Sequence, residues 1–593
     1  MESRFNQILT HFLKWRIKNL NDRRFAIILS LAIGIVVGLA AVVLKWMIAN
    51  IENQIQEGTL STIKNYFYFG LPMIGIGLTI LFVRYFMKGN LPSGISYLLY
   101  RIGRKNSRIS KKHNWGHLVG SALTVGFGGS VGIEGPIVLT GSSIGSTLGE
   151  LMHLNRRQKM LLIGCGSSAA IAAIFNAPVA GVLFTLEVIL AEMKVGLLVP
   201  LLISSVTGVT ISKLLVGDQN TFYFQLVEKI QISDYPIFIL LGLLCGLLSV
   251  YFMRVSAQFL KRTNKIENKT KAWITGGIML GGLILLFPSL FGEGYWTLKA
   301  ILEGKAESIV EGTLYGDFDF KKSILLGFIF LTILLKPIAT SITRMSGGIG
   351  GVFAPSLLMG GLSGFLISRL VNISGITTVS EQNFTLVGMA GIASGVLHSP
   401  LTSIFLIAEL TDGYELFVPL MIVAAIAYGT SYYFERHSFY TKALAERGDL
   451  IVHDRDKTVL TTIGVKQVLE RDLVPVKING DLSDLVEAIS KSKRNIFPVI
   501  DEEGYLKGII TLDDVRHIIF KPEVYASVGI KDVMKAPLDT IDYYEPMDFV
   551  MEKFDHTGAW NLPVILKGKY IGFVSKSKIF NSYRKRLQTE TEM

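Results

Sequence analysis

Cysteine is nearly absent from this 593-residue chain, which contains two, Cys165 and Cys245. Both lie in apolar runs, so a disulfide scaffold is excluded, and their spacing fits no metal site. We predict two small buried side chains and no bound metal. The chain also lacks a His-Glu-x-x-His pair, which argues against a zinc-dependent intramembrane protease. The Gly-Ser-Ser segments at Gly141 and Gly166 suit helix packing better than a nucleophile, and we predict that the protein is not an enzyme.

Charge is scarce as well, and it is unevenly distributed. Charged residues make up 18% of the chain and hydrophobic residues 50%, and the mean hydropathy is +0.44. From Phe25 to about Tyr433 apolar runs follow one another, whereas charges are frequent from Glu435 onward. This pattern predicts an N-terminal segment over 1–24, a large membrane domain over 25–445 and a smaller soluble part after it.

The net charge of +12 comes largely from Lys and Arg in short loops between apolar runs. Such loops are typical of the cytoplasmic side of a membrane protein, so we predict no nucleic-acid partner and cytoplasmic N- and C-termini. The first apolar run, Phe25 to Val43, is long enough to span and has no small-residue cleavage site, which argues against a cleaved signal peptide. We expect a multi-pass protein of the plasma (inner) membrane. The clustered residues are Arg23, Arg24, Arg101, Arg104, Lys105, Arg108, Lys111, Lys112, Arg156, Arg157, Lys159, Lys261, Arg262, Lys265, Lys269 and Lys271.

The apolar runs fall into two sets by length. A straight helix needs about 20 apolar residues to cross a bilayer core of about 30 Å. Runs that meet this length are 25–48, 197–215, 236–260 and 324–340. Runs that are short or broken by Gly and Pro are 117–130, 136–150, 160–175, 178–189, 352–368, 385–397 and 400–409. The short set predicts broken helices whose ends are buried in protein.

The membrane domain contains an internal repeat, over about 25–220 and 235–435. The segment from Asn176 to Glu187 aligns with His398 to Glu409, each with Pro third and Glu last. Upstream, a Gly-rich segment near 132 matches another near 348. Broken helices at corresponding positions of two halves are typical of a transporter with a central binding site. Glu187 and Glu409 are expected to stabilise helix ends.

The soluble part contains a second repeat, joined to the membrane domain by a polar linker over 446–462. Phe497-Pro-Val-Ile precedes Gly508-Ile-Ile-Thr, and Leu562-Pro-Val-Ile precedes Gly572-Phe-Val-Ser. Each unit predicts a β-α-β-β-α order, with helices near 482–492 and 546–556. Neither unit has a large core by itself, so we expect the two to pack as a pair.

Several segments suit the binding of an anion that has lost its water. Helix N-termini offer free N–H groups and partial positive charge, and small residues let the backbone approach. Three segments have this character, and a fourth follows the last span. They are Pro92-Ser93-Gly94-Ile95, Gly132-Ile133-Glu134-Gly135-Pro136, Gly350-Gly351-Val352-Phe353-Ala354-Pro355 and Phe439-Tyr440.

These four motifs, in this order, resemble the anion-site motifs of the CLC family of chloride channels and chloride/proton antiporters, over roughly residues 25–445. The resemblance implies an all-α membrane fold with an inverted repeat and a chloride pathway in each subunit of a homodimer. It implies that Glu134 is the gating glutamate, whose carboxylate competes with the anion and moves away when protonated. The implied chloride-binding residues are Ser93, Tyr440, Val352 and Phe353, and the implied backbone lining is Gly94, Ile95, Gly132, Gly135 and Gly351.

Simpler interpretations of these residues remain open. Ser93 also suits a helix N-cap, and Tyr440 suits the membrane interface. Glu134 differs, because a carboxylate in an apolar run is costly in a membrane and is functional by default.

Two positions depart from the family pattern. Ile133 stands where the family often has Lys or Arg. Val188 stands where antiporters usually carry an internal proton-transfer glutamate, and valine cannot relay protons. This favours a passive, voltage- or pH-gated chloride channel, with chloride/proton antiport through Glu134 as the alternative. A CBS-regulated cation transporter would need clustered carboxylates, which the isolated acids at 134, 187 and 409 do not supply.

The C-terminal pair, over 463–520 and 521–585, resembles CBS domains, which often bind adenine nucleotides. In the first, Thr511 and Asp514 match the ribose-binding pattern, so ATP, ADP or AMP is an expected ligand. In the second, Ser575 is followed by Lys578 where Asp is expected. A purely structural dimerising module is the alternative.

Overall fold

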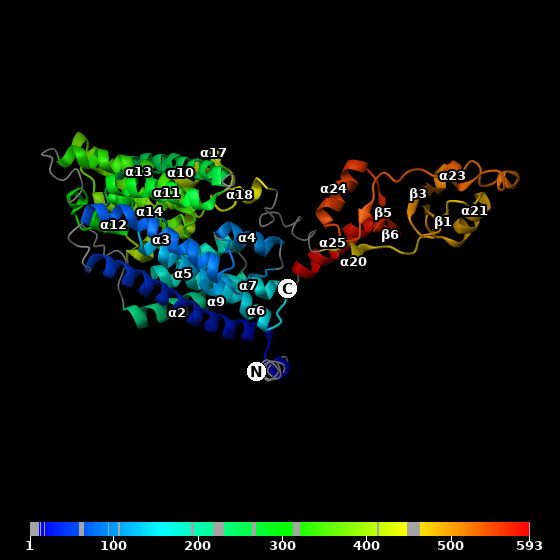
Figure 1. Ribbon diagram of the computed structural model, residues 1–593, viewed down its shortest axis with the longest axis horizontal. Coiled ribbons are helices and arrows are strands. Elements are labelled where there is room, and N and C mark those ends of the chain that lie inside the picture. Colours follow the sequence, from blue (N-terminus) through cyan, green and yellow to red (C-terminus); the bar gives the residue numbers. More distant parts are fainter. Residues whose placement is uncertain are drawn as a thin grey trace. The chain divides into compact units, whose positions relative to one another are not determined.

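The computed structural model divides the chain into two units, residues 1–450 and 451–593 (Figure 1). Each unit is described by itself. The predicted linker over 446–462 falls mostly outside the described residues. The structure describes residues 11, 13–16, 18–57, 64–89, 91–92, 94–104, 107–190, 195–217, 230–263, 268–311, 321–411, 414–447 and 463–591.

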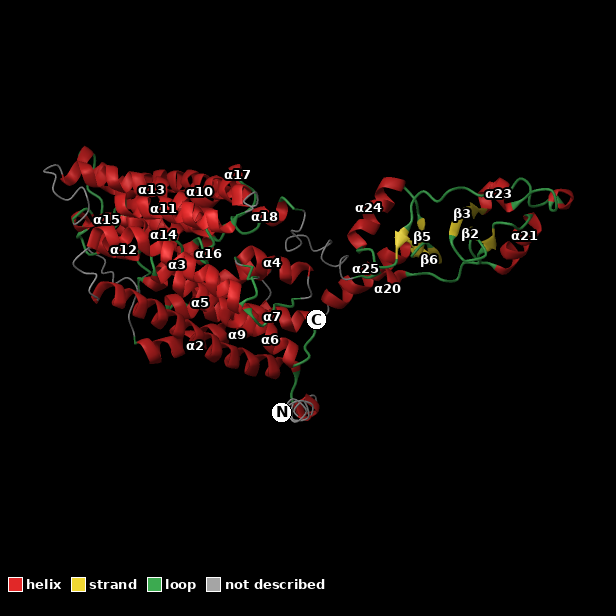
Figure 2. Ribbon diagram, in the orientation of Figure 1, coloured by secondary structure: helices red, strands yellow, loops and turns green. Residues whose placement is uncertain are grey.

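The described part of the first unit is built from helices (Figure 2). Its first half contains α2 (Asp22–Glu57), α3 (Lys64–Phe86), α4 (Ile95–Arg104), α5 (His113–Gly126), α6 (Glu134–Leu151), α7 (Arg156–Phe175), α8 (Pro178–Phe184), the π-helical turn η2 (Thr185–Leu190) and α9 (Val195–Val216). Its second half contains η3 (Ile232–Asp234), α10 (Tyr235–Thr263), α11 (Lys269–Leu286), η4 (Pro288–Leu290), α12 (Tyr295–Leu302), η5 (Ala306–Ile309), α13 (Lys321–Met345), α14 (Phe353–Ser374), α15 (Glu381–Leu397), α16 (Pro400–Leu410), α17 (Phe417–Phe434) and α18 (Lys442–Ala445).

Eight helices among the described residues are long and apolar enough to cross a membrane, namely α2, α3, α7, α9, α10, α13, α14 and α17. They differ in how they meet their surroundings. The apolar window of α7 is 78% buried inside the protein, whereas that of α3 is 28% buried. Because α3 exposes apolar side chains that water would not tolerate in such number, its outer face suits lipid. The first unit is therefore a multi-pass membrane domain.

The prediction that the apolar runs broken by Gly and Pro form short helices was only partly correct. Runs 136–150, 160–175 and 352–368 lie in helices of 18, 20 and 22 residues, α6, α7 and α14. Their glycines do not break the helices, because they serve close packing: a Cβ on Gly141 of α6 would lie 2.2 Å from the Gly166 carbonyl of α7. The described α-helices of this unit that have 11 residues or fewer are α4, α8, α12, α16 and α18, of 10, 7, 8, 11 and 4 residues.

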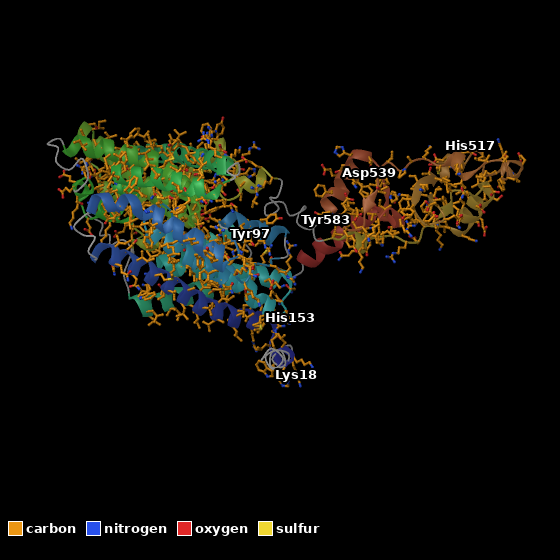
Figure 3. The ribbon with its side chains drawn as sticks, viewed as in Figure 1. Lys18, Tyr97, His153, His517, Asp539 and Tyr583 are labelled. Carbon is orange, nitrogen blue, oxygen red and sulfur yellow. The ribbon has the colours of Figure 1, made fainter. Side chains whose placement is uncertain are left out.

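The two halves repeat each other in packing, as expected. The pairs α6–α7, α2–α9 and α7–α9 recur as α14–α15, α10–α17 and α15–α17. In Figure 1 the two halves form adjacent groups, the first blue to cyan and the second green to yellow. Asn176 and His398, which end α7 and α15, both adopt the left-handed conformation with φ of 55°. Side chains fill the space between the helices, and Tyr97 of α4, labelled in Figure 3, stacks on His113 of α5.

The second unit holds two three-stranded sheets, of order β1-β2-β3 and β4-β5-β6. In each sheet the first pair of strands is parallel and the second antiparallel. The elements are α20 (Val465–Val468), β1 (Val476–Lys477), α21 (Leu482–Lys491), β2 (Ile496–Ile500), β3 (Leu506–Thr511), α22 (Leu512–Val515), η6 (Pro522–Val524), α23 (Ile530–Val533), β4 (Ile541–Asp542), α24 (Met547–Thr557), β5 (Asn561–Leu566), β6 (Lys569–Ser575) and α25 (Lys576–Thr591).

The two repeats of this unit exchange their lead-in helices. Val465 and Val468 of α20 precede the first sheet in sequence but belong to the core around the second sheet. Ile530 of α23 precedes the second sheet but belongs to the core around the first. The repeats therefore form one interlocked pair, as their small individual cores require.

Candidate functional site

The Gly-rich loops that precede α6 and α14 meet at the centre of the membrane domain. The Gly132 N–H donates to the Gly351 carbonyl at 3.0 Å, and the Gly351 N–H donates to the Gly132 carbonyl at 2.6 Å. A Cβ on Gly135 would lie 3.3 Å from the Gly351 Cα. Only residues without side chains allow this approach. The two helix N-termini, one from each half, are thereby brought together.

Two threonines of the repeat brace these loops reciprocally. The Ser130 N–H donates to the Thr343 hydroxyl at 3.2 Å, and the Ile349 N–H donates to the Thr124 hydroxyl at 3.0 Å. Thr124 lies on α5 and Thr343 on α13, so each half holds the loop of the other. The contacts fix the directions in which α6 and α14 begin.

Glu134 is the first residue of α6 and is 2% exposed. Its Oε1 accepts a hydrogen bond from the Tyr295 hydroxyl at 3.4 Å, and its Oε2 has no hydrogen-bond partner among the described residues. The carboxyl folds back over Gly132, where an added Cβ would lie 2.1 Å from Oε2. The backbone N–H of Ala354, in the first turn of α14, faces the same carboxyl. The Glu134 side chain thus lies at the N-terminus of α14.

The other implied chloride-site residues lie at two helix starts and one loop. Val352 is the N-cap and Phe353 the first residue of α14, each 1% exposed. Ile95 begins α4 after Gly94, whose φ of +95° favours glycine. Ser93 lies outside the described residues. Tyr440 is 4% exposed, and its carbonyl accepts from the Ser96 hydroxyl at 2.7 Å, which joins the Phe439-Tyr440 segment to α4.

A cation that the sequence motifs did not indicate lies beside this segment. The Arg344 guanidinium lies over the Phe439 ring, 5.3 Å from its centroid. It also lies 4.0 Å from the position that a Cβ on Gly94 would take. Arg344 therefore adds positive charge where Gly94 and Phe439 meet. Its position near the end of α13, outside the four motifs, left no sequence signal for this contact.

The sequence motifs also did not indicate a cluster of charged residues around Glu134. Lys336 of α13 is fully buried, and its ammonium donates to the Ser130 hydroxyl at 2.8 Å and to the Gly292 carbonyl at 3.0 Å. Glu293 accepts from the Ile133 N–H at 3.1 Å. Glu134, Glu293 and Lys336 thus form one cluster, in which the charge of each group affects the others. A lysine inside an apolar run was the available signal, since a membrane lysine usually has a partner.

Glu187 and Glu409 cap helices of the opposite half, as expected. Glu187 accepts from the N–H groups of Leu401 and Thr402 at 3.1 and 2.8 Å and from the Thr402 hydroxyl at 2.6 Å. Glu409 accepts from the N–H groups of Val179 and Ala180 at 2.9 and 2.8 Å. Their oxygens satisfy the first turns of α16 and α8. Val188, beside Glu187, is 8% exposed and brings no ionisable group.

In the second unit, Thr511 and Asp514 form a cap at the start of α22. Asp514 accepts from the Thr511 N–H at 3.0 Å, from its hydroxyl at 2.7 Å and from the Lys535 ammonium at 2.5 Å. Burial alone would raise the pKa of Asp514, but hydrogen bonds from Lys535 and Thr511 hold it below its ordinary value. In the second repeat the Ser575 hydroxyl donates to Glu470 at 3.1 Å and accepts from the Lys578 N–H at 3.2 Å.

Comparison with known families and proteins agrees with this architecture. The sequence model of the family described as "Voltage gated chloride channel" matches residues 79–432, and that of the CBS domain matches 465–521 and 530–585. Chloride channel protein CLC-f of Arabidopsis thaliana is 27% identical over 452 residues, which cover 67% of this chain and 56% of the relative. A putative chloride channel protein ClcB-like of Ralstonia nicotianae is 27% identical over 422 residues, covering 68% and 92%. The chain thus spans about half the length of the plant relative.

Solved structures share the fold. A slow cyanobacterial Cl⁻/H⁺ antiporter superposes with a TM-score of 0.58 at 22% identity and covers 73% of this chain and 99% of its own. A eukaryotic CLC transporter superposes with a TM-score of 0.58 at 17% identity, covering 93% and 97%. A CLC-type fluoride/proton antiporter reaches 0.56 at 23% identity, covering 70% and 97%. At these identities the likeness shows the fold alone.

Proposed function

This chain belongs to the voltage-gated chloride channel family, the CLC family of anion transporters and channels, and we propose that it conducts chloride passively through a pathway gated by Glu134. The observation that carries the proposal is the position of the Glu134 carboxyl. It lies at the N-terminus of α14, beside Gly351 and the Ala354 amide. A negative carboxylate there competes with an anion for the same backbone N–H groups.

The proposed chloride site is formed by four segments of the chain. Backbone N–H groups of Val352 and Phe353 and hydroxyls of Ser93 and Tyr440 are the donors. Gly94, Ile95, Gly132, Gly135 and Gly351 keep the backbone lining open to a close approach. The positive charge of Arg344, beside Phe439, supports an anion in this region.

Opening follows from the charge of Glu134. While ionised, the carboxylate stays near the first turn of α14 and the pathway is closed. Protonation removes its charge and its attraction to the helix N-terminus, so it moves away and chloride takes its place. The hydrogen bond from the Tyr295 hydroxyl is long, at 3.4 Å, which supports a side chain that can leave once its charge is removed.

The absence of an internal proton acceptor favours passive conduction. Val188 cannot bind a proton, and the adjacent Glu187 is occupied by three hydrogen bonds at the start of α16. Releasing it would leave the N–H of the buried Thr402 without its acceptor, at a cost of about 1–3 kcal/mol. Glu187 is therefore a poor substitute for a proton-transfer residue.

Chloride/proton antiport is the second candidate. Solved structures of the same fold are described as a Cl⁻/H⁺ antiporter and a fluoride/proton antiporter, and Glu134 would be the shared proton acceptor. The reversal potential of the purified protein in a planar bilayer, under a chloride gradient with and without a pH gradient, separates the two. A value at the chloride equilibrium potential regardless of pH supports the channel, and a value that follows the pH gradient overturns it.

Glu134→Gln tests the gate directly. The variant removes the titrating charge but keeps the side-chain shape, so chloride flux into proteoliposomes should persist and lose its pH dependence. Glu150→Gln, at the other end of α6, is the matched control and should behave as the parent. Unchanged pH dependence in Glu134→Gln would reject the gating role.

We also propose the arrangement around the pathway. The protein acts as a homodimer in the plasma (inner) membrane with both termini in the cytoplasm, since the basic loops lie between its spans.

The CBS pair binds an adenine nucleotide, with Thr511 and Asp514 facing the ribose. ATP, ADP and AMP should each be tested by thermal shift against Asp514→Ala, and equal melting shifts in variant and parent would favour the purely structural module.

A further inference from the structure

A cavity of about 520 Å³ opens beside the gate. It lies toward the end of α2 that is away from the predicted cytoplasmic segment, because its α2 lining begins at Ile48. Trp296, which lines it, is 43% exposed, so the cavity is open at the surface of the protein. The polar and aromatic lining includes Glu52, Tyr68, Glu293, Tyr295, Trp296 and Glu311. The cavity therefore presents acidic groups to solvent on the side predicted to be external.

Two of these lining residues reach the gate. Glu293 accepts from the N–H of Ile133, the residue that precedes Glu134 in the chain, at 3.1 Å. The Tyr295 hydroxyl donates to Glu134 Oε1 at 3.4 Å. Glu293 keeps partial exposure, whereas Glu134 is 2% exposed. A proton that travels from the cavity to Glu134 thus meets Glu293 and Tyr295 first.

The charges around Glu293 favour a single shared proton. The groups whose charges act on Glu293 are Glu134 of α6, Glu52 of α2 and Lys336 of α13, and Tyr295 of α12 lies beside both carboxyls. Lys336 is fully buried and hydrogen-bonded. Apart from Glu52, which lines the cavity, the cluster contains two carboxyls and one ammonium, which together carry no net charge when one carboxyl is protonated. Because net charge is costly away from water, this one-proton state is favoured.

We propose that Glu293 is a second proton-accepting residue of the gate, which takes a proton from water in the cavity and shares it with Glu134. The inference rests on the proposed gating role of Glu134. Hydronium in the cavity gives its proton to the Glu293 carboxylate and becomes water. The proton then passes to the Glu134 carboxylate, and Glu293 returns to its anionic form beside Lys336. The protonated Glu134 releases the α14 N-terminus, and chloride enters.

The test must distinguish this proton-accepting role of Glu293 from a purely structural one. Its Oε1 also satisfies the Ile133 N–H, and a glutamine can accept that bond equally well. Glu293→Gln therefore keeps the cap and removes only the charge and the proton. A purely structural Glu293 predicts parental pH dependence in this variant.

The measurement is chloride efflux from proteoliposomes as a function of external pH. With one negative charge removed beside it, Glu134 ionises more readily, so the pH of half-maximal flux should move to lower pH by about one unit. Glu303→Gln removes a charge at the exposed end of α12, where Glu303 pairs with Lys305, and should leave the midpoint unchanged.

Lys336→Met tests the same charge balance without a change at Glu293. Loss of the ammonium should move the midpoint to higher pH, and the double variant of Glu293→Gln with Lys336→Met should return it toward the parental value. A parental midpoint in Glu293→Gln, or two single shifts of the same sign, overturns the inference. Persistent pH dependence in Glu134→Gln would instead overturn the proposed gate, so the two failures are distinguishable.

Discussion

Gly132 shows how a single missing side chain positions the gate. The Glu134 carboxyl occupies the space that a Cβ on Gly132 would need, at 2.1 Å from Oε2. The first atoms that such a Cβ would meet belong to the mobile end of a side chain rather than to backbone. The position therefore controls where the carboxyl lies more than whether the loop folds.

Gly132→Ala should displace the Glu134 carboxyl and bias the gate toward opening. Overpacking typically costs about 1–3 kcal/mol, enough to change the open fraction about tenfold. Chloride efflux at alkaline pH should rise, and its dependence on pH should weaken. Gly429→Ala on α17, where an added Cβ meets nothing within 4 Å, is the control. Parental efflux at every pH would show that the carboxyl does not use this space.

A second prediction concerns the charge of Asp514. Because its folded-state pKa is lowered, its ionised form contributes stability above the unfolded pKa of about 3.9, and this is lost as pH falls through the folded pKa. Asp514→Asn should increase hydrogen–deuterium exchange of the β3 amides at neutral pH. The difference from the parent should vanish below about pH 3. Asp513→Asn, exposed and paired with Arg516, is the control, and a difference that persists in acid would contradict the account.

At the scale of elements, the short helices α8 and α16 depend on the opposite half of the repeat. Each begins with a proline, so its first turn offers N–H groups only from the second residue onward. Glu409 and Glu187 accept these groups across the interface between halves. This reciprocal capping stabilises two short helices by giving acceptors to N–H groups of their first turns that have no intrahelical partner.

Glu409→Ala should therefore destabilise the membrane domain. The N–H groups of Val179 and Ala180 would lose their acceptor, at a cost of about 1–3 kcal/mol, and the melting temperature in detergent should fall by several degrees. Glu415→Ala, an exposed acid before α17, should change it little. An unchanged melting temperature together with altered pH dependence of transport would indicate a proton-transfer role for Glu409 instead.

At the scale of the whole molecule, the two halves of each internal repeat are joined in different ways in the two units. In the membrane domain, the halves meet through paired Gly-rich loops and reciprocal caps. In the soluble unit, the repeats exchange α20 and α23, so that each core contains residues from beyond its own stretch of sequence. Boundaries drawn along the chain, such as 463–520 and 521–585, therefore do not coincide with the cores.

Ile530→Ala tests this exchange. Ile530 is fully buried in the core of the first sheet, and such a truncation typically costs about 2–5 kcal/mol. Hydrogen exchange should rise in β1, β2 and β3, which precede it in sequence, more than in β5 and β6. Ile541→Ala, in the other core, should produce the reverse pattern. Faster exchange confined to the strands that follow Ile530 would contradict the exchanged arrangement.

The sequence by itself determined the features that depend on local pattern or repetition. Hydropathy separated the membrane domain from the soluble unit, and the recurrence of Pro and Glu at matching spacing located α8, α16 and the capping roles of Glu187 and Glu409. Gly-rich interruptions of the apolar runs predicted the helix lengths less well. Runs such as 136–150 and 352–368 were expected to be short, yet they lie in full helices, because a glycine can serve close packing as well as interruption.

Only the tertiary structure decided which distant groups surround the gate. Lys336, Glu293 and Tyr295 lie far from Glu134 in the chain and share no periodicity with it, so no pattern could place them beside one carboxyl. The same holds for Arg344 beside Phe439. A sequence motif records neighbours along the backbone, whereas the electrostatics of a buried site depend on every charge within a few ångströms, whichever helix carries it.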